Sequence, residues 1–471
     1  MPLTDDEAAI LKRLQRRLDR DLTGYSIPGP GRRRRRGFLQ LDAYYDGEQR
    51  LEQLGYAVPE DLREFTTIVA WPATYVDTLV DRCQPVGFRL PGQPKADDGL
   101  YEMWQANDLE SESVLARIDR KVFGRGYYCI GSNDDDPDIP LITVDSPLQM
   151  THEWSNRKRT TTAAARFYVD ESGPKRVRHA TLYLPDSTTW LVMDNGWKVT
   201  DRDEHDLGRV PVVPLLGKQR THDRYGVTSM LRIIGLTDAA ARALTNAQVA
   251  TEVMALPQRW AAGLSPEDFK DPETGEQMTT WEAYFGAVWS TINKDAKFGQ
   301  FDAADLANFT KIVSHYAQLV SGATGLPMRY FGQMSDNPPS AAGIRADESR
   351  LVLAAENDNL GEADALEDVM TIADRIRTGD WNPKLRRLET QFRNPATPTV
   401  AEEGDAAVKK YQAGIVPLRQ TRRDLGYSPA QIETMEKDDL EAAQQAQAAR
   451  VDPTLDRIAD GLLNADANLG E

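Results

Sequence analysis

The hydrophobic pattern of this chain changes period twice, and this change restricts the fold more than any other feature. Apolar residues recur at helical spacing up to about residue 123, alternate in short β-rich runs over about 125–217, and return to helical spacing from Gly226. Separate helical and β-rich blocks favour an α+β protein over an alternating α/β one. We therefore predict a mainly helical α+β fold with an antiparallel sheet over about 125–217.

Local signals support both kinds of element. Thr4 precedes Glu7 by three residues, the spacing of a helix capping box, and the apolar residues that follow share one helical face: Ile10, Leu11, Leu14 and Leu18. Asn195-Gly196 lies between two β-rich runs and predicts a hairpin, because both residues tolerate positive φ. These signals predict a helix over about 4–22 and a β-hairpin near residue 195.

The helical part after Gly226 is divided into long helices. We predict them over about 229–254, 303–322 and 340–376, with an aromatic-containing insertion at 257–302 and a loop at 328–340. The third helix is acidic, with eight Asp or Glu and two Arg between Ser340 and Met370. A Pro/Thr-rich boundary near 398 precedes an Ala/Gln/Glu-rich helical tail. With 471 residues, we expect two to four domains.

Charge is spread unevenly along the chain. The formal net charge is -17, but residues 1–50 carry +3 and the rest carries -20. The positive end centres on five consecutive arginines in a Gly/Pro-rich setting, Arg32, Arg33, Arg34, Arg35 and Arg36. This run indicates an extended arm, either a solvated linker or a contact to acidic protein or nucleic acid. The acidic balance of the whole chain argues against a protein that coats nucleic acid tightly.

No catalytic, metal or cofactor site emerges from the motifs. The phosphate-binding loop, the H-E-x-x-H zinc motif and the G-x-S-x-G elbow are all absent from the sequence, and its five histidines are scattered. The acidic run at 134–138 fails the calcium-loop register and is better explained as a solvated turn. Cys83 and Cys129 are expected to be small core residues in a reducing compartment. We also expect a soluble protein, because neither a signal peptide nor a bilayer-length apolar run occurs.

The order of these segments resembles the portal proteins of tailed double-stranded DNA bacteriophages, of the siphophage type whose hosts are often Gram-positive. Three stretches carry the resemblance: YYDGEQRLEQLGYAVPEDL with the following TIVAWPATYVDTLVDRCQPVGF, FTKIVSHYAQLVSGATGLPMRYFGQMSDNPPSAAGIRADESRLV, and YQAGIVPLRQTRRDLGYSP. Together they span most of the chain. None is as stringent as a catalytic motif, but their order is fairly specific.

The resemblance implies a division of the chain by position. It implies an N-terminal helix and basic arm at 1–37, a wing at 38–225, stem helices at 226–254 and 303–325, a clip at 255–302, a tunnel loop with the long acidic helix and a return to the wing at 326–398, and a helical crown and tail at 399–471. The family implies a ring, expected to be a dodecamer, at one capsid vertex of the virion. DNA is packaged and ejected through such a ring. Assembly would take place in the host cytoplasm.

The resemblance also implies partners and site residues, with no cofactor and no membrane. The expected partners are the large terminase, the head-to-tail adaptor, the major capsid and scaffolding proteins, and double-stranded DNA that passes without specific binding. An acidic lining would let the DNA slide. The residues implied for the tunnel loop are Met334, Ser335, Asp336, Asn337 and Ser340, and those for the clip interface are Trp281, Tyr284, Phe285 and Trp289. We expect the arginine run Arg32–Arg36 on the outside, against capsid or scaffold.

Two other functions stay open on the sequence alone. One is a different phage structural component, such as a head-tail adaptor or a minor capsid protein without a DNA channel. The other is an enzyme with an unrecognised site in the sheet at 125–217, which a deep pocket with converging titratable groups would support.

Overall fold

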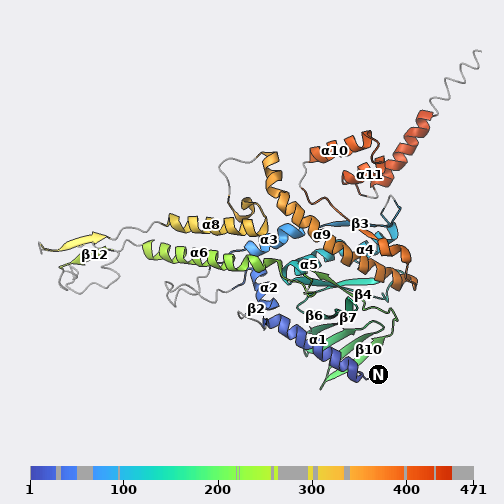
Figure 1. Ribbon diagram of the computed structural model, residues 1–471, viewed down its shortest axis with the longest axis horizontal. Helices are drawn as coiled ribbons and strands as arrows, with labels where there is room; N and C mark the ends of the chain where they lie inside the picture. The colour runs from blue at the N-terminus through green and yellow to red at the C-terminus, as the bar shows by residue number, and fades with distance from the viewer. Residues whose placement is uncertain are drawn as a thin grey trace, which may run out of the picture. The chain divides into compact units, whose positions relative to one another are not determined.

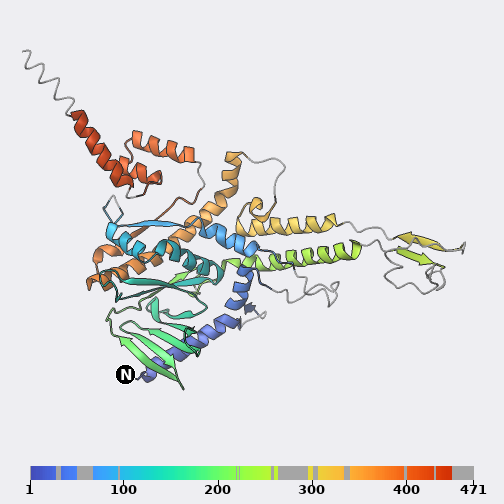
Figure 2. The same ribbon diagram turned by 180° about the vertical axis from the view of Figure 1, so that it is seen from behind.

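Figures 1 and 2 show the computed structural model of the chain from two sides. It describes residues 2–27, 33–49, 67–93, 96–218, 220–221, 223–255, 259–263, 295–300, 306–333, 340–396, 400–428 and 431–447. The chain divides into two compact units, Met1–Pro395 and Ala396–Glu471. This division falls close to the boundary expected at 399.

The first unit begins with a capped amphipathic helix. In α1 (Asp5–Thr23) the Thr4 hydroxyl accepts from the Glu7 N–H and the Glu7 carboxylate accepts from the Thr4 N–H, which confirms the capping box. Its apolar face packs against a small-residue core on a neighbouring sheet, formed by Leu11, Leu14, Ala163, Ala165, Ala180, Leu182 and Leu191. A short hairpin of β1 (Tyr25–Ile27) and β2 (Arg33–Arg35) follows, and then α2 (Phe38–Asp46).

The expected β-rich region forms two antiparallel sheets. The first has the order β11-β4-β5, and the second has the order β10-β9-β8-β7-β6. Their strands are β4 (Arg125–Gly131), β5 (Leu141–Asp145), β6 (Met150–Ser155), β7 (Thr160–Asp170), β8 (Val177–Tyr183), β9 (Thr188–Met193), β10 (Trp197–Asp203) and β11 (Val212–Leu216). The chain turns after Asp145, so β6 begins the second sheet. Residues of both sheets share one small core, formed by Tyr127, Met150, Ala164 and Val212. The hairpin at Asn195-Gly196 is confirmed, with positive φ at both residues.

Of the helices that precede the sheets, α5 (Leu109–Val122) packs directly on the three-stranded sheet. The helices α3 (Trp71–Val80) and α4 (Asp98–Ala106) pack on α5. A second short sheet pairs β3 (Pro85–Arg89) with β14 (Glu389–Phe392), two strands that the sequence analysis did not predict. Neither strand has a neighbouring partner in the sequence, so periodicity alone gave no signal for this pairing.

Two of the long helices run side by side in both views of the molecule (Figures 1 and 2). They are α6 (Ile234–Ala255), preceded by the 3-10 turn η2 (Ser229–Arg232), and α8 (Ala307–Thr324). Buried residues of α8 lie near its C-terminal end, at Ala317 and Val320. The short strands β12 (Arg259–Ala262) and β13 (Lys297–Gln300), which flank the segment between the two helices, pair antiparallel.

The third long helix, α9 (Ala341–Thr378), follows the 3-10 turn η4 (Met328–Phe331). Its C-terminal half supplies the largest share of a core beneath α4, α5 and β4, through Ala365, Leu366, Val369, Met370, Ile372 and Ala373. The turn η5 (Pro383–Arg387) then leads to β14. The expected α+β class, with long helices and an antiparallel β-region, is confirmed.

The second unit is helical over the residues that the structure describes. It contains α10 (Val400–Gln412), α11 (Leu418–Asp424) and a helix over 431–447. Two ion pairs join α11 to that last helix, Arg422 with Asp439 at 2.7 Å and Arg419 with Glu436 at 3.4 Å. The helical tail expected from the sequence is present there, and its assignment as a crown stays a prediction.

Candidate functional site

Most residues expected in the tunnel loop and the clip lie outside the described residues. This holds for Met334, Ser335, Asp336 and Asn337, for the clip residues Trp281, Tyr284, Phe285 and Trp289, and for Arg32. Ser340 is described, and its hydroxyl accepts from the Gly343 N–H at 3.2 Å as the N-cap of α9. The structure therefore shows how the segments beside the expected loop are held, and where the rest of the arginine run lies.

A cluster of charged side chains joins the segments on both sides of residues 334–339. We call Arg82, Arg329, Tyr330 and Glu348 the loop anchor. The Glu348 carboxylate accepts from the Arg329 guanidinium, from the Tyr330 hydroxyl at 3.2 Å, and lies 3.3 Å from the Arg82 guanidinium. Its side chain is only 7% exposed, so these charge-assisted contacts are shielded from solvent. The anchor fixes η4 against the first turns of α9.

Arg82 extends the loop anchor to two more segments. Arg82 lies just after α3, donates to the Tyr330 hydroxyl at 3.2 Å and donates to the Pro395 carbonyl at 2.8 Å. The turn into η4 is set locally, because Gly325 ends α8 in the left-handed region and Pro327 begins η4. The end of this helix near residue 322 was expected from the sequence, whereas the cluster joining Arg82 to Glu348 was not.

Where the chain passes from β11 to α6, three glycines bring backbone segments into direct contact. We call Gly124, Gly217 and Gly226 the stem joint. Gly217 donates to the Gly124 carbonyl at 2.8 Å, and Val227 donates to the Gly217 carbonyl at 3.1 Å. Gly226 has φ +74, and a Cβ there would lie 1.8 Å from the Gly124 oxygen. No residue with a side chain fits this position without a backbone shift.

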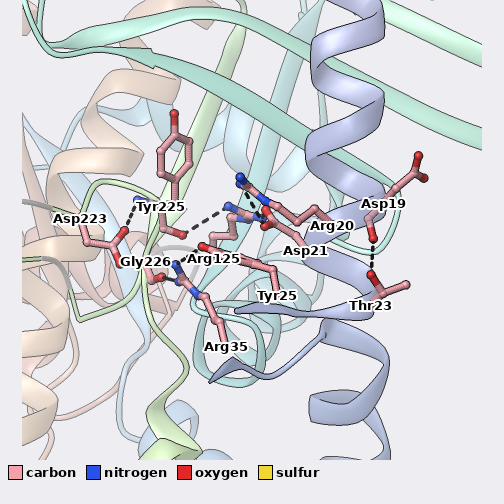
Figure 3. A network of polar contacts seen from close by, with 10 residues as sticks. All are labelled: Asp19, Arg20, Asp21, Thr23, Tyr25, Arg35, Arg125, Asp223, Tyr225 and Gly226. Atoms are coloured by element: carbon pink, nitrogen blue, oxygen red, sulfur yellow. Dashed lines mark hydrogen bonds and ion pairs between the residues drawn. The ribbon is translucent and has the colours of Figure 1, made fainter. Parts of the chain in front are cut away.

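The N-terminal hairpin contacts Gly226 of the stem joint (Figure 3). Arg35 of β2 donates to the Gly226 carbonyl and lies 3.5 Å from the Asp223 carboxylate and 3.4 Å from the Tyr25 hydroxyl. Beside it, the fully buried Arg125 donates to Asp21 of α1 and lies 3.5 Å from the Tyr225 carbonyl. Arg35 and Arg125, which come from distant parts of the chain, therefore both contact the turn at residues 223–226.

The position of Arg35 and Arg36 corrects one interpretation of the arginine run. The Arg36 guanidinium lies 4.0 Å from Asp238 of α6, whose carboxylate also accepts from the Tyr44 hydroxyl at 2.7 Å. Both arginine side chains are about one-third exposed and have acidic partners within the chain. A solvated linker therefore does not describe these two residues, because each contacts the segment that leads into α6 or α6 itself. Arg33 and Arg34 lie in β2.

The acidic residues of α9 mostly have partners within the chain. Seven of the nine are engaged: Asp347, Glu348, Asp358, Glu362, Glu367, Asp368 and Asp374. Glu362 is fully buried, with the Arg117 and Arg120 guanidinium groups at 3.8 and 3.6 Å. Burial raises the pKa of Glu362, although these arginines oppose the shift. Most carboxylates of this helix are therefore paired within the chain. The number of acidic residues in the sequence overstates the free negative charge on the surface of the helix.

The remaining predictions about chemistry concern isolated groups. Cys83 and Cys129 are both buried and unbonded to each other, as expected for core residues, and burial raises the pKa of Cys83 to about 12. Within the described ranges no group of three or more His, Cys, Asp or Glu is placed to hold a metal ion. The acidic residues 134–138 lie in an exposed turn between β4 and β5. None of the helices described is long and apolar enough to cross a membrane.

Comparison with known proteins decides the family. Residues 31–446 match the family described as phage portal protein, SPP1 Gp6-like. This chain belongs to that family. The portal proteins of Mycobacterium phages D29 and L5 are each 39% identical to it over 413 residues, which cover 85% of this chain and 84% of each relative. The resemblance found in the sequence is therefore confirmed, and so is the expectation that this portal family member is structural rather than an enzyme.

Two solved structures are also similar to this portal family member. They are the virion of a native gene transfer agent particle, with a TM-score of 0.47, and the neck of a native gene transfer agent particle with C12 symmetry, with a TM-score of 0.41. Both are 13% identical to this chain, of which they cover 88% and 86%, and the matches span 99% and 96% of the solved chains.

Proposed function

We propose that this protein forms the portal ring at one vertex of a phage capsid, through which genomic DNA is packaged and later ejected. The membership of residues 31–446 in the portal family carries the proposal, and the 39% identity to two portal proteins supports it. The described structure supplies a mechanical basis. The paired helices α6 and α8 are held at one end by the stem joint and by the loop anchor.

The finer assignments are part of the same proposal. We propose twelve copies per ring, with residues 38–225 as the wing, 226–254 and 303–325 as the stem, 255–302 as the clip, 326–398 as tunnel loop and long helix, and 399–471 as the crown. Residues 334–337 and Ser340 would line the narrow part of the channel. The loop anchor supports this placement, because it fixes the segments on both sides of residues 334–339.

The proposed partners follow from that position in the virion. The clip, through Trp281, Tyr284, Phe285 and Trp289, would bind the large terminase during packaging and the head-tail adaptor afterwards. The capsid and scaffolding proteins would surround the wing. Arg32, Arg33 and Arg34 are the members of the basic run that we assign to this contact. DNA would pass without specific binding, and the ring would assemble in the host cytoplasm.

Electron microscopy of the purified full-length protein tests the ring. We expect particles with rotational symmetry and an axial channel, and class averages should give the number of copies. Protein that stays monomeric under every assembly condition, including the presence of scaffolding protein, would overturn the proposal.

A terminase-binding assay tests the clip separately. Trp281→Ala and Trp289→Ala should weaken binding to the large terminase at least about tenfold while rings persist, because aromatic anchors dominate interfaces of this kind. Trp190→Ala is the matched control, since Trp190 is a partly exposed wing residue. Equal terminase binding by all three variants would contradict the clip assignment.

A further inference from the structure

A long open cleft runs beside α9 on the first unit. Its volume is about 710 Å³, and it lies between α9, β11 and the β6–β7 hairpin. One wall is a single face of α9, with lining residues at alternating three- and four-residue spacing: Ala354, Asn357, Gly361, Asp364 and Asp368. These span about 21 Å at a rise of about 1.5 Å per residue. A cleft of this length fits an extended segment or a short helix.

The cleft has two walls of opposite charge. The α9 wall carries Asp358, Asp364 and Asp368, whereas five Lys or Arg residues line the floor and the facing wall. Arg120 and Arg209 have carboxylate partners across the cleft, in Asp358 and Asp368. The Arg159 guanidinium, on the facing hairpin, has no ion-pair partner among the residues that the structure describes. The lining therefore has excess positive charge in a chain whose net charge is -17.

We propose that this cleft receives a segment of a second copy of this chain. The inference rests on the proposed ring and deepens it by naming one side of the contact between neighbours. Subunits in a ring meet through two different surfaces, so each copy needs a receiving surface and an inserting one. The net positive charge of the cleft lining complements an acidic neighbour, and the small side chain of Ala354 leaves room for an inserted segment beside α9.

The charge pattern favours protein over nucleic acid as the occupant. A phosphate backbone would be attracted by Arg159, Lys218 and Arg224 but repelled by Asp364. The Arg120 and Arg209 guanidinium groups already pair with Asp358 and Asp368. Burial lowers the pKa of Lys218 to about 8, and the neighbouring charges of Lys121 and Arg232 add to this shift. Lys218 therefore loses its proton more readily than an ordinary lysine and attracts phosphate less strongly. A protein segment offers charges of both signs and matches both walls.

Cleft variants with matched controls test the proposal by their effect on ring assembly. Asn357→Trp fills the cleft from an exposed position, and Arg159→Glu reverses its unpaired charge. Glu356→Trp and Lys158→Glu are the controls, because both are exposed neighbours that do not line the cleft. Mass photometry should show that the two cleft variants need about tenfold more protein for half-assembly, equivalent to about 1.4 kcal/mol per contact. The controls should stay within about twofold of the unmodified chain.

Crosslinking of assembled rings separates this inference from the ring itself. Cys83 and Cys129 are buried, so a maleimide-linked benzophenone can be directed to Asn357→Cys or to the control Glu356→Cys. Irradiated rings should give crosslinked pairs of chains from Asn357→Cys, with the site on the second copy identified by mass spectrometry. Rings that give only crosslinks within one chain would overturn the inference while leaving the proposed function intact.

The remaining outcomes also have definite meanings. Absence of rings from the unmodified chain would overturn the proposed function, and this inference with it. Normal assembly of both cleft variants, with weaker retention of DNA at low salt, would assign the cleft to nucleic acid and overturn the second copy as its occupant. Equal thermal midpoints for variants and controls would establish that any assembly defect is not a folding defect.

Discussion

The stem joint and the loop anchor hold neighbouring parts of the same molecule by different physical means. The joint depends on backbone contact, because Gly124, Gly217 and Gly226 leave no room for a Cβ. The anchor depends on side-chain charge, because Glu348 gathers two arginines and a tyrosine hydroxyl. Backbone packing of this kind tolerates almost no substitution, whereas a charge cluster can be weakened in steps.

This difference suggests that the stem joint and the loop anchor have different mechanical roles within the proposed portal. The backbone contact among the three glycines fixes the direction in which α6 leaves the β-region and does not itself depend on charge. A shielded ion cluster beside residues 334–339 can break and re-form as its partners move. We therefore expect the joint to act as a rigid pivot and the anchor as an adjustable support, and the following predictions test that contrast.

The largest effect is expected at Gly226. Gly226→Ala places a Cβ against the Gly124 oxygen and adds a strained φ, so we expect a loss above about 4 kcal/mol or no soluble protein. Gly208→Ala is the control, since Gly208 also has a positive φ, +69, but an added Cβ there would meet no atom within 4 Å. That control should lose only about 1–2 kcal/mol in denaturant unfolding. Similar losses for the two variants would disprove the backbone contact as the cause.

The next largest effect is expected at Glu348. Glu348→Ala removes the shared acceptor of Arg82, Arg329 and Tyr330, so the free energy of unfolding should fall by about 2–3 kcal/mol. Asp347→Ala removes an adjacent carboxylate that is 63% exposed and should cost less than about 0.5 kcal/mol. Glu348→Gln should lie between them. If Glu348→Ala behaves like Asp347→Ala, the anchor contributes nothing to stability.

A third, intermediate effect concerns pH near the stem joint. Asp119 lies in α5, five residues before Gly124 of the stem joint. Burial raises the pKa of its carboxyl to about 7; a hydrogen bond with Ser146 opposes this shift, and the nearby charge of Asp42 adds to it. The folded state thus holds this proton more tightly than the unfolded chain. Stability should therefore fall as pH rises from about 4 to 7.

Asp119→Asn isolates this pH dependence. The variant should lose that part of the slope and be more stable than the unmodified chain by about 1–2 kcal/mol at pH 8. Urea unfolding at pH 5 and pH 8 measures both quantities. Asp108→Asn, at the start of the same helix, is the control and should leave the slope unchanged. A slope that survives in Asp119→Asn would assign the pH dependence to other groups.

The smallest effect is expected at Arg35. Arg35→Ala removes the bonds to the Gly226 carbonyl and to Asp223 but leaves the glycine contact in place, so the loss should be about 1 kcal/mol. Arg176→Ala removes a largely exposed ion pair with Glu171 and should change unfolding by less than about 0.5 kcal/mol. A loss at Arg35 as large as that at Gly226 would show that charge, not backbone packing, holds the joint.

Local features of the fold were predictable from the sequence. The capping box at Thr4, the hairpin at Asn195-Gly196 and the end of the helix near residue 322 each depend on residues a few positions apart, and all three are present. The three long helices lie within a few residues of their predicted bounds. The division into two sheets and the β3–β14 pair were missed, because strands distant in sequence leave no periodic signal where they meet.

The candidate site was less predictable than the fold. Sequence reasoning selected arginines at 32–36 for their charge, but it had no means of showing that Arg35 meets Gly226, 191 residues away. The count of acidic residues on the third long helix carried no information about their partners, so the pairing of Glu348 and Glu362 with arginines could not be predicted. Arg82 drew no notice, because a single arginine after a helix carries no motif.

The sequence by itself determined the order of helical and β-rich blocks, the helix caps and the portal family, since hydrophobic period and capping act between residues close in the chain. Only the tertiary structure decided which charges are neutralised and which backbones touch. Hydrogen bonds and ion pairs require atoms within a few ångströms, and in the stem joint and the loop anchor those atoms come from segments tens to hundreds of residues apart.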